Sequence, residues 1–183
     1  NLRGNLVHAA LQALYRDRPD RDALREWSGA ERANRIAAAV RHAFTRHERH
    51  ADATLAAVLS VERERTKRLL GAVIDTDVGR EPFRVAAVEN RIDAEIGTLA
   101  LQLRADRLDA MPDGSLAVID YKTGQPKRFL ARDEPNDVQL VVYACALREP
   151  VAGLALFNVE SRHCGIDGAG PAFGGGDEFA DDL

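Results

Sequence analysis

The chain has 183 residues, 45% of them hydrophobic, which is enough to build one domain with a substantial core. Its formal net charge of −4 argues against a broadly basic surface for nucleic acid. No apolar run approaches the roughly 18 residues that span a bilayer, and no signal-peptide pattern opens the chain, so we expect no membrane segment.

The N-terminal part, residues 1–80, is predicted to be mostly helical because it is rich in Ala, Leu, Arg and Glu. A first helix fits 5–15, where residues of one stripe recur at helical spacing. The pattern of a capping box at Ser28–Glu31 begins a second helix. Apolar spacing over 55–73 indicates a third, long helix.

Residues 81–166 are predicted to form a sheet core, because Val and Ile become frequent and the apolar period shortens toward two. The pattern predicts one helix at 136–147 and strands at 84–93, 98–109, 115–122 and 153–161. Helices, antiparallel strands, a helix and a strand in this order indicate a mixed α/β or α+β domain. We therefore expect one domain over 1–166.

The C-terminal segment, 167–183, differs in composition from the rest of the chain. It holds five acids and no Lys or Arg, so that without it the acidic count falls from 29 to 24 against 25 basic residues. Glycines are frequent from Gly165 to Gly176, which favours a flexible chain. We expect a poorly packed, Gly-rich acidic tail or linker, with its two phenylalanines, Phe173 and Phe179, outside the core.

The segment between the second and third predicted strands, Met111–Ser115, has the sequence of a tight turn. Its proline suits the first central position of a type I turn, and its glycine suits the left-handed residue that closes a three-residue hairpin loop. Such a loop pairs Met111 with Ser115 and, five residues outward on each strand, Asp106 with Asp120. A two-residue loop would instead place Asp106 opposite Tyr121.

The two opposed carboxylates predict a metal site. Directly opposed side chains share a face of the sheet, with Cβ atoms roughly 4.5–5.5 Å apart, so two like charges there are destabilising without a cation between them. A divalent cation fits best because hard cations prefer carboxylate oxygens. Lys122 lies two residues beyond Asp120 and projects from the same face. The plainer alternative is a surface ion pair at the end of a strand.

Four motifs follow one another along Arg3–Glu160. Asp106 precedes Asp120-Tyr121-Lys122 within "IDYKTG", Gly4–His8 reads Gly-x-x-x-His, and Gln139–Tyr143 reads Gln-x-x-x-Tyr. Together and in this order they resemble the PD-(D/E)XK nuclease superfamily, specifically its RecB/AddB-like branch. The resemblance implies an α/β fold with a restriction-endonuclease-like mixed sheet flanked by helices, and with a helical N-terminal part.

The resemblance also implies a metal site and a catalytic lysine. His8, Asp106 and Asp120, helped by the Tyr121 carbonyl, would bind Mg²⁺, with Mn²⁺ tolerated because imidazole joins the carboxylates. Lys122 would position or help to deprotonate the attacking water, or offset the developing negative charge. This mechanism requires no covalent nucleophile, and the sequence shows no evident one.

Two of these motifs also have ordinary structural explanations. His8 alone fits a partly buried helix histidine, while Gly4, one turn earlier, permits a close backbone approach. Gln139 and Tyr143 share a helix face, and by resemblance they lie near the site, contacting DNA or supporting Lys122. Asn136-x-x-Gln139 also fits a capping box, which would explain Gln139 without any catalytic role.

Other candidates are weaker. Glu89 matches an acidic position often found in the RecB-like branch, where it either supports the ligands or lies on the polar face of a strand. Asp109 is the nearest alternative to Asp106, but its parity should turn it away from Asp120. The N-terminal arginines alternate with acids, which favours solvated helix faces over a phosphate track. One set of histidines has no carboxylate or cysteine pattern around it and so gives little support for metal binding: His42, His47 and His50.

By resemblance, the chain is a divalent-metal-dependent DNase, a RecB-type exonuclease that works in DNA end processing or DNA repair with a helicase subunit or domain. The alternatives are a catalytically inactive DNA-binding or scaffold module of a helicase–nuclease complex, and a phosphoesterase with another substrate. Some relatives hold an iron–sulfur cluster through four cysteines, which Cys145 and Cys164 cannot supply. Two cysteines favour a reducing, cytoplasmic compartment, and the missing initiator Met predicts a fragment of a longer protein.

Overall fold

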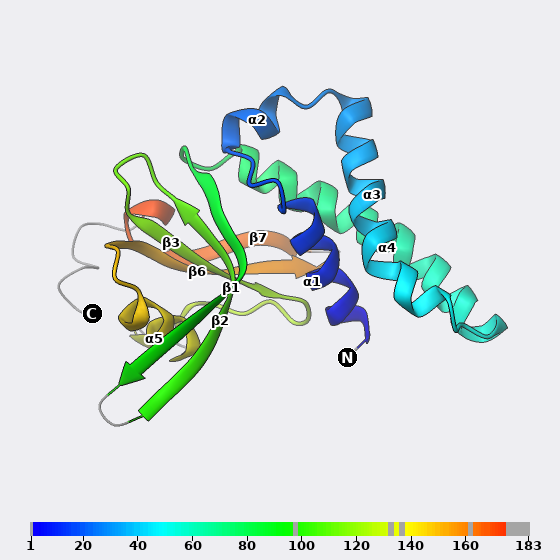
Figure 1. Ribbon diagram of the computed structural model, residues 1–183. Helices are drawn as coiled ribbons and strands as arrows, with labels where there is room; N and C mark the ends of the chain where they lie inside the picture. Colours follow the sequence, from blue (N-terminus) through cyan, green and yellow to red (C-terminus); the bar gives the residue numbers. More distant parts are fainter. Residues whose placement is uncertain (1, 97–98, 132–133, 136–137, 161–162, 175–183) are drawn as a thin grey trace.

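The computed structural model describes residues 2–96, 99–131, 134–135, 138–160 and 163–174 (Figure 1). Its N-terminal part is helical, as the composition predicts, with α1 (Leu2–Leu14), α2 (Arg21–Glu26), α3 (Gly29–Glu48) and α4 (Ala53–Val78). Local capping explains where three helices begin, because the side chains of Asp20, Ser28 and Asp52 each accept a hydrogen bond from a backbone N–H three residues on. The cap expected at Ser28 is confirmed, whereas α2 has no counterpart among the predicted elements.

A mixed five-stranded sheet follows in the order β1-β2-β3-β6-β7. Its strands are β1 (Arg84–Ile96), β2 (Leu99–Ala110), β3 (Leu116–Lys122), β6 (Val151–Glu160) and β7 (His163–Ala169). Between β3 and β6 the chain forms the paired short strands β4 (Leu130–Ala131) and β5 (Glu134–Pro135) and then helix α5 (Val138–Ala146). Because β3 and β6 run parallel while their neighbours run antiparallel, the sheet is mixed as predicted.

Helices cover both faces of this sheet (Figure 1). One core joins the N-terminal helices to Ile119 and Tyr121 of β3, and the other joins α5 to Val118 of β3. Successive residues of a strand face opposite sides, so β3 contributes to both cores and is buried except at its two end residues. The predicted fold class, a mixed sheet flanked by helices with a helical N-terminal part, is confirmed.

The hairpin between β2 and β3 has the register that the turn sequence predicts. The N–H of Met111 donates to the carbonyl of Ser115 at 2.9 Å, and Gly114 has φ 88°, the left-handed conformation that closes a three-residue loop. The ladder then continues to the pair Arg107–Ile119. One further residue on each strand reaches Asp106 and Asp120, so the alternative two-residue loop is wrong.

The expectation of a poorly packed, Gly-rich tail from 167 onward is wrong at its start, because β7 pairs antiparallel with β6 along 163–169. Glycine is required there by close packing: a Cβ on Gly168 would lie 2.6 Å from the Cβ of Ala155 and 2.6 Å from the carbonyl oxygen of Leu154. Glycines that favour a flexible chain in isolation are therefore the residues that let β7 approach β6.

The short helix η1 (Pro171–Phe173) corrects the expected tail further. Ala172 is buried, and Phe173 is half-buried with the guanidinium carbon of Arg80 5.2 Å from the centre of its ring. The part of the expected tail that the structure describes, 167–174, thus belongs to the folded domain. Residues 175–183, including Phe179, lie outside the described residues.

Candidate metal centre

A polar pocket of about 390 Å³ lies where β3 ends and α1 passes beside it. Helix α1 contributes Gly4, Asn5 and His8 to its lining, β2 contributes Arg104 and Asp106, and the remainder is 120–123. The fold therefore brings together three of the predicted motifs, from positions more than a hundred residues apart in the chain. Asp106 and Asp120 line the same pocket, as the hairpin register predicts.

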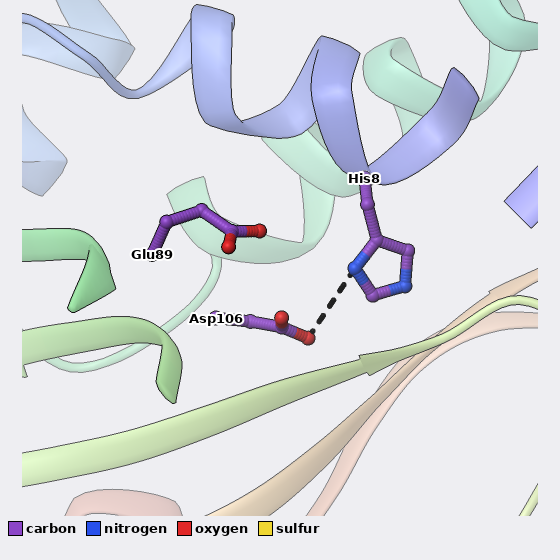
Figure 2. Close-up of side chains that lie close together, drawn as sticks. All are labelled: His8, Glu89 and Asp106. Atoms are coloured by element: carbon purple, nitrogen blue, oxygen red, sulfur yellow. Dashed lines mark ion pairs between the residues drawn. The ribbon is translucent and has the colours of Figure 1, made fainter. Parts of the chain in front are cut away.

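His8, Glu89 and Asp106 form the tightest group of possible metal ligands in the described part of the chain. One donor atom from each lies within 4.8 Å of the others, and His8 Nδ1 is 3.5 Å from Asp106 Oδ2. Figure 2 shows the three side chains pointing toward a common space from α1, β1 and β2. One imidazole nitrogen and two carboxylates form a donor set that suits Mg²⁺ or Mn²⁺.

The charges of this group show that it is short of positive charge. Burial opposes protonation of His8, but the hydrogen bond and charge of Asp106, with the charges of Asp120 and Glu89, outweigh it and raise the pKa of His8. Burial also raises the pKa of Glu89. The charge of Arg104 lowers this pKa and the charge of Asp106 raises it, and the net shift is upward. A cation bound among these side chains would supply the positive charge that protonation now supplies.

Asp106 is held in place by the neighbouring strand. Its Oδ2 accepts a hydrogen bond of 2.8 Å from the backbone N–H of Tyr121. Asp120 Oδ2 lies 2.8 Å from Lys122 Nζ, and both side chains are mostly buried, which confirms that they project from one face of β3. The tight group of three includes Glu89 and does not include Asp120, although Asp120 lines the same pocket.

Glu89 is the residue whose place at the site the sequence left open. Its φ of 49° is unusual for a side chain other than Gly, and it lies between the pairs Val88–Arg107 and Asn90–Ala105 of the β1–β2 ladder. Its Oε2 also forms an ion pair of 2.8 Å with Nε of the largely exposed Arg104. The register that places Glu89 opposite Asp106 runs outward from the pair Ile96–Leu99. A two-residue Gly-X turn at Gly97 and Thr98, which the sequence offers, is the signal that could have predicted it.

Gly4 allows α1 to approach the loop after β3. A Cβ built on Gly4 would lie 2.9 Å from Oγ1 of Thr123, closer than real side chains pack. His8 lies one turn further along α1, so this close approach sets the distance from His8 to the strand that carries Asp120. The expected close backbone approach at Gly4 is confirmed.

Gln139 and Tyr143 lie on α5 and are absent from the lining of the pocket. The Gln139 amide is hydrogen-bonded to the Tyr143 hydroxyl at 2.5 Å, and that hydroxyl in turn donates to the backbone carbonyl of Arg104. Tyr143 is buried. The pair therefore fastens α5 to β2 two residues before Asp106, and Asn136, the other half of the possible capping box, lies outside the described residues.

A buried ionic network lies on the opposite face of β2 and β3. Arg107, which is fully buried, reaches Asp77 at 2.7 Å and Asp109 at 2.6 Å, and Arg80 pairs with the same two carboxylates. The Tyr121 hydroxyl accepts a hydrogen bond of 3.3 Å from Arg107. Asp109 thus faces away from the pocket, as its parity predicts.

The network touches the candidate metal centre through an aromatic contact. The ring of Tyr121 meets the ring of His8 edge-on, with centroids 6.2 Å apart. Tyr121 thus joins both faces of the sheet: its backbone N–H orients Asp106, its ring packs against His8 and its hydroxyl meets Arg107. No sequence signal pointed to this arrangement, because its members come from α1, α4, β2 and β3.

Three histidines from the end of α3 and the residues after it lie outside the pocket of the metal centre. His42, His47 and His50 line a groove between α1 and α3, and among the described residues none of them belongs to a group of possible metal ligands.

The arrangement of Asp106, Asp120 and Lys122 at the end of one hairpin agrees with a comparison against protein families. The model of the PD-(D/E)XK nuclease superfamily matches residues 1–171. The chain belongs to the PD-(D/E)XK nuclease superfamily. Membership implies metal-dependent phosphodiester hydrolysis, and the observed sheet and helices are consistent with the restriction-endonuclease-like fold of this superfamily.

Two further comparisons add little to this membership. No curated protein matches this PD-(D/E)XK chain significantly. A solved structure titled "Crystal structure of SSO0001" is 15% identical, with 96% of this chain and 68% of that chain covered and a TM-score of 0.34. That likeness is too low to support a statement about function. No helix among the described residues is long and apolar enough to cross a membrane.

Proposed function

We propose that this PD-(D/E)XK protein is a divalent-metal-dependent deoxyribonuclease of RecB type, an exonuclease in DNA end processing or repair. The observation that carries the proposal is one pocket that contains His8, Asp106, Asp120 and Lys122 at the end of β3. We assign the metal ligands to His8, Asp106 and Asp120 with the Tyr121 carbonyl, and we add Glu89 because of its place beside His8 and Asp106. Mg²⁺ is the proposed ion, with Mn²⁺ tolerated.

The residues of the pocket have separate roles in this proposal. A bound divalent cation would lower the pKa of a coordinated water and polarise the phosphoryl oxygen. Lys122, held by Asp120 at 2.8 Å, supplies a fixed positive charge next to the attacking water and the developing phosphorane. The guanidinium of Arg104, at the rim of the pocket and 62% exposed, is placed to contact a phosphate of the incoming strand.

Gln139 and Tyr143 have an indirect role in the proposal. Their hydrogen bonds hold β2 at Arg104, so they support the strand that carries Asp106. A contact with DNA at the exposed Gln139 stays part of the prediction. We propose that the protein works in the cytoplasm with a helicase subunit or domain, a setting that rests on the resemblance of its four motifs to RecB-type proteins.

The alternative is a scaffold module that binds DNA without cutting it. Modules of that kind lose active residues, whereas Asp106, Asp120 and Lys122 are all present and line one pocket in this chain. Their presence favours an enzyme. The decisive measurement is cleavage of end-labelled linear DNA and of closed circular DNA, with and without EDTA.

Two substitutions separate the roles of the pocket residues. Lys122→Ala should leave metal binding intact and lower cleavage by about a hundredfold or more, because one preorganised electrostatic group is removed. Asp120→Asn should lower cleavage by weakening metal binding, so that excess Mg²⁺ or Mn²⁺ partly restores it. Calorimetric metal titration distinguishes the two variants, and Lys127→Ala, at an exposed lysine outside the pocket, is the matched control.

Undiminished cleavage by Lys122→Ala would contradict the proposed mechanism. An intact protein that binds metal and DNA and never cuts, alone or with a helicase partner, would favour the scaffold. Digestion of linear but not closed circular DNA is the result expected for an exonuclease.

A further inference from the structure

The candidate metal centre opens into a longer groove that runs along α1. A second pocket of about 490 Å³ shares Asn5, His8 and Arg104 with the metal pocket and adds Arg91 at its edge. A third and larger pocket, of about 970 Å³, shares Asn5 and Ala9 with the second. The three pockets are therefore contiguous, with one face of α1 as their common wall.

The far end of this groove is basic. Its lining on α3 comes from the last two turns of the helix and the residues after it, and it includes His42, Thr45, Arg46, His47, Arg49 and His50. No acidic side chain belongs to the described lining of this part of the groove. Figure 1 shows the two walls, α1 and α3, side by side next to the sheet.

Most arginines of the N-terminal helices are neutralised by acids, but two of those in the groove are not. Arg32, Arg35, Arg63 and Arg65 each pair with at least one carboxylate. Arg46 and Arg49 are exposed and take part in no ion pair within the described part of the chain. Positive charge therefore gathers at these two positions, beside a continuous path to the metal centre.

We propose that this groove, the α1–α3 groove, binds the phosphate backbone of the DNA strand whose scissile phosphate lies at the metal centre. The inference rests on the proposed function and adds the path that the rest of the substrate takes. Arginine suits this role because its planar guanidinium donates two parallel hydrogen bonds to a phosphate. The described lining contains no Phe, Tyr or Trp, and its two arginines would contact phosphates and not base edges, so the contacts should be independent of sequence and sensitive to salt.

The test is a double substitution, Arg46→Gln with Arg49→Gln, against a matched control, Arg41→Gln with Arg68→Gln. All four arginines are exposed, and the control pair lies on α3 and α4 outside the three pockets and without an ion-pair partner among the described residues. Both variants lose the same formal charge. Because the side chains are exposed, both should melt at the temperature of the unaltered protein.

Binding is measured by fluorescence anisotropy of labelled single-stranded and duplex DNA in EDTA over a series of salt concentrations. Removing two phosphate contacts should reduce the slope of log K against log salt by about 1.4 for single strands and about 1.8 for duplex DNA. The control should leave the slope unchanged. Equal slopes for the two variants, or DNA binding that the groove variant leaves unaltered, would overturn the proposed path.

A second measurement separates this inference from the proposed nuclease activity. Hydrolysis of bis(p-nitrophenyl) phosphate with Mn²⁺ uses a substrate too small to reach from the metal pocket into the α1–α3 groove. The groove variant should therefore keep this activity but show a raised KM for long DNA. If the groove variant shows the reduced slope of log K against log salt, but the protein cleaves no substrate, the groove is supported and the nuclease activity is refuted. Normal cleavage of long DNA with an unchanged KM would refute the groove while leaving the nuclease in place.

Discussion

Replacement of Arg107 by methionine tests whether the ionic network beneath the metal centre holds β2 in position. Methionine has a similar length and fills much of the same space, so the main loss is the charge and its hydrogen bonds. Arg107 is fully buried and contacts Asp77 at 2.7 Å and Asp109 at 2.6 Å. Its removal leaves two buried carboxylates that share the single cation of Arg80.

The size of the effect follows from this geometry. Removing one partner from a buried ion pair costs about 3–5 kcal/mol, because the remaining charge stays buried without compensation. Arg80 still lies 2.9 Å from Asp77 and 2.8 Å from Asp109, which favours the lower end, about 3 kcal/mol. For a domain of this size that corresponds to a fall in melting temperature of about 6–12 °C.

The deficit should also depend on pH. Burial raises the pKa of Asp77, but the charges of Arg107 and Arg80, with hydrogen bonds from Arg107 and Tyr15, outweigh it and hold this pKa below its ordinary value. In the intact protein the resulting stability is present above the pKa of an unfolded Asp, about 3.9, and is lost as pH falls through the lower folded value. Without Arg107 the folded pKa of Asp77 rises, so the variant loses less stability on acidification.

The other groups that face Asp77 do not change this direction. Tyr15 and Tyr121 stay neutral, because burial raises the pKa of both hydroxyls. The difference in free energy of unfolding between the intact protein and Arg107→Met should therefore shrink from pH 7 to acidic pH. Urea unfolding followed by circular dichroism at several pH values measures it, with the largely exposed Arg104→Met as the control.

Two results would refute this account of Arg107. A loss of under about 1 kcal/mol would mean that the network contributes little, as happens when a buried ion pair can be replaced by apolar packing. A deficit that grows on acidification would mean that Asp77 is not the carboxylate that Arg107 holds in its charged form.

Three smaller changes test the supports of the site. Gly4→Ala should weaken calorimetric metal binding, because the new methyl group would lie 2.9 Å from Oγ1 of Thr123, and Thr123→Ala in the same chain should restore binding. Gly168→Ala should lower the free energy of unfolding by several kcal/mol, because its Cβ would lie 2.6 Å from that of Ala155; an unchanged urea midpoint would contradict the paired strand β7. Tyr143→Phe should cost about 1 kcal/mol for the lost hydrogen bonds to the β2 backbone and to α5, and a thermal melt identical to that of the intact protein would contradict this anchoring role.

The sequence alone determined the features that depend on neighbouring residues. The turn at Met111–Ser115 sets its own hydrogen bonds and the conformation of Gly114, and strand alternation carries this register outward to Asp106 and Asp120. The cap at Ser28 is equally local, since its hydroxyl bonds a backbone N–H three residues away. These contacts form within one segment, so the segment's own sequence is sufficient to predict them.

Only the tertiary structure decided which distant residues meet at the site. Glu89 of β1 and Asp106 of β2 meet His8, which lies on α1 more than eighty residues earlier in the chain. Arg107 joins β2 to Asp77 of α4, thirty residues earlier. The need for glycine at Gly168 of β7 is evident only once β6 packs against it. Contacts of this kind depend on how helices and strands pack over long sequence separations. Alternation and spacing within one segment cannot specify them, because these patterns fix which face a side chain occupies and leave open what that face will contact.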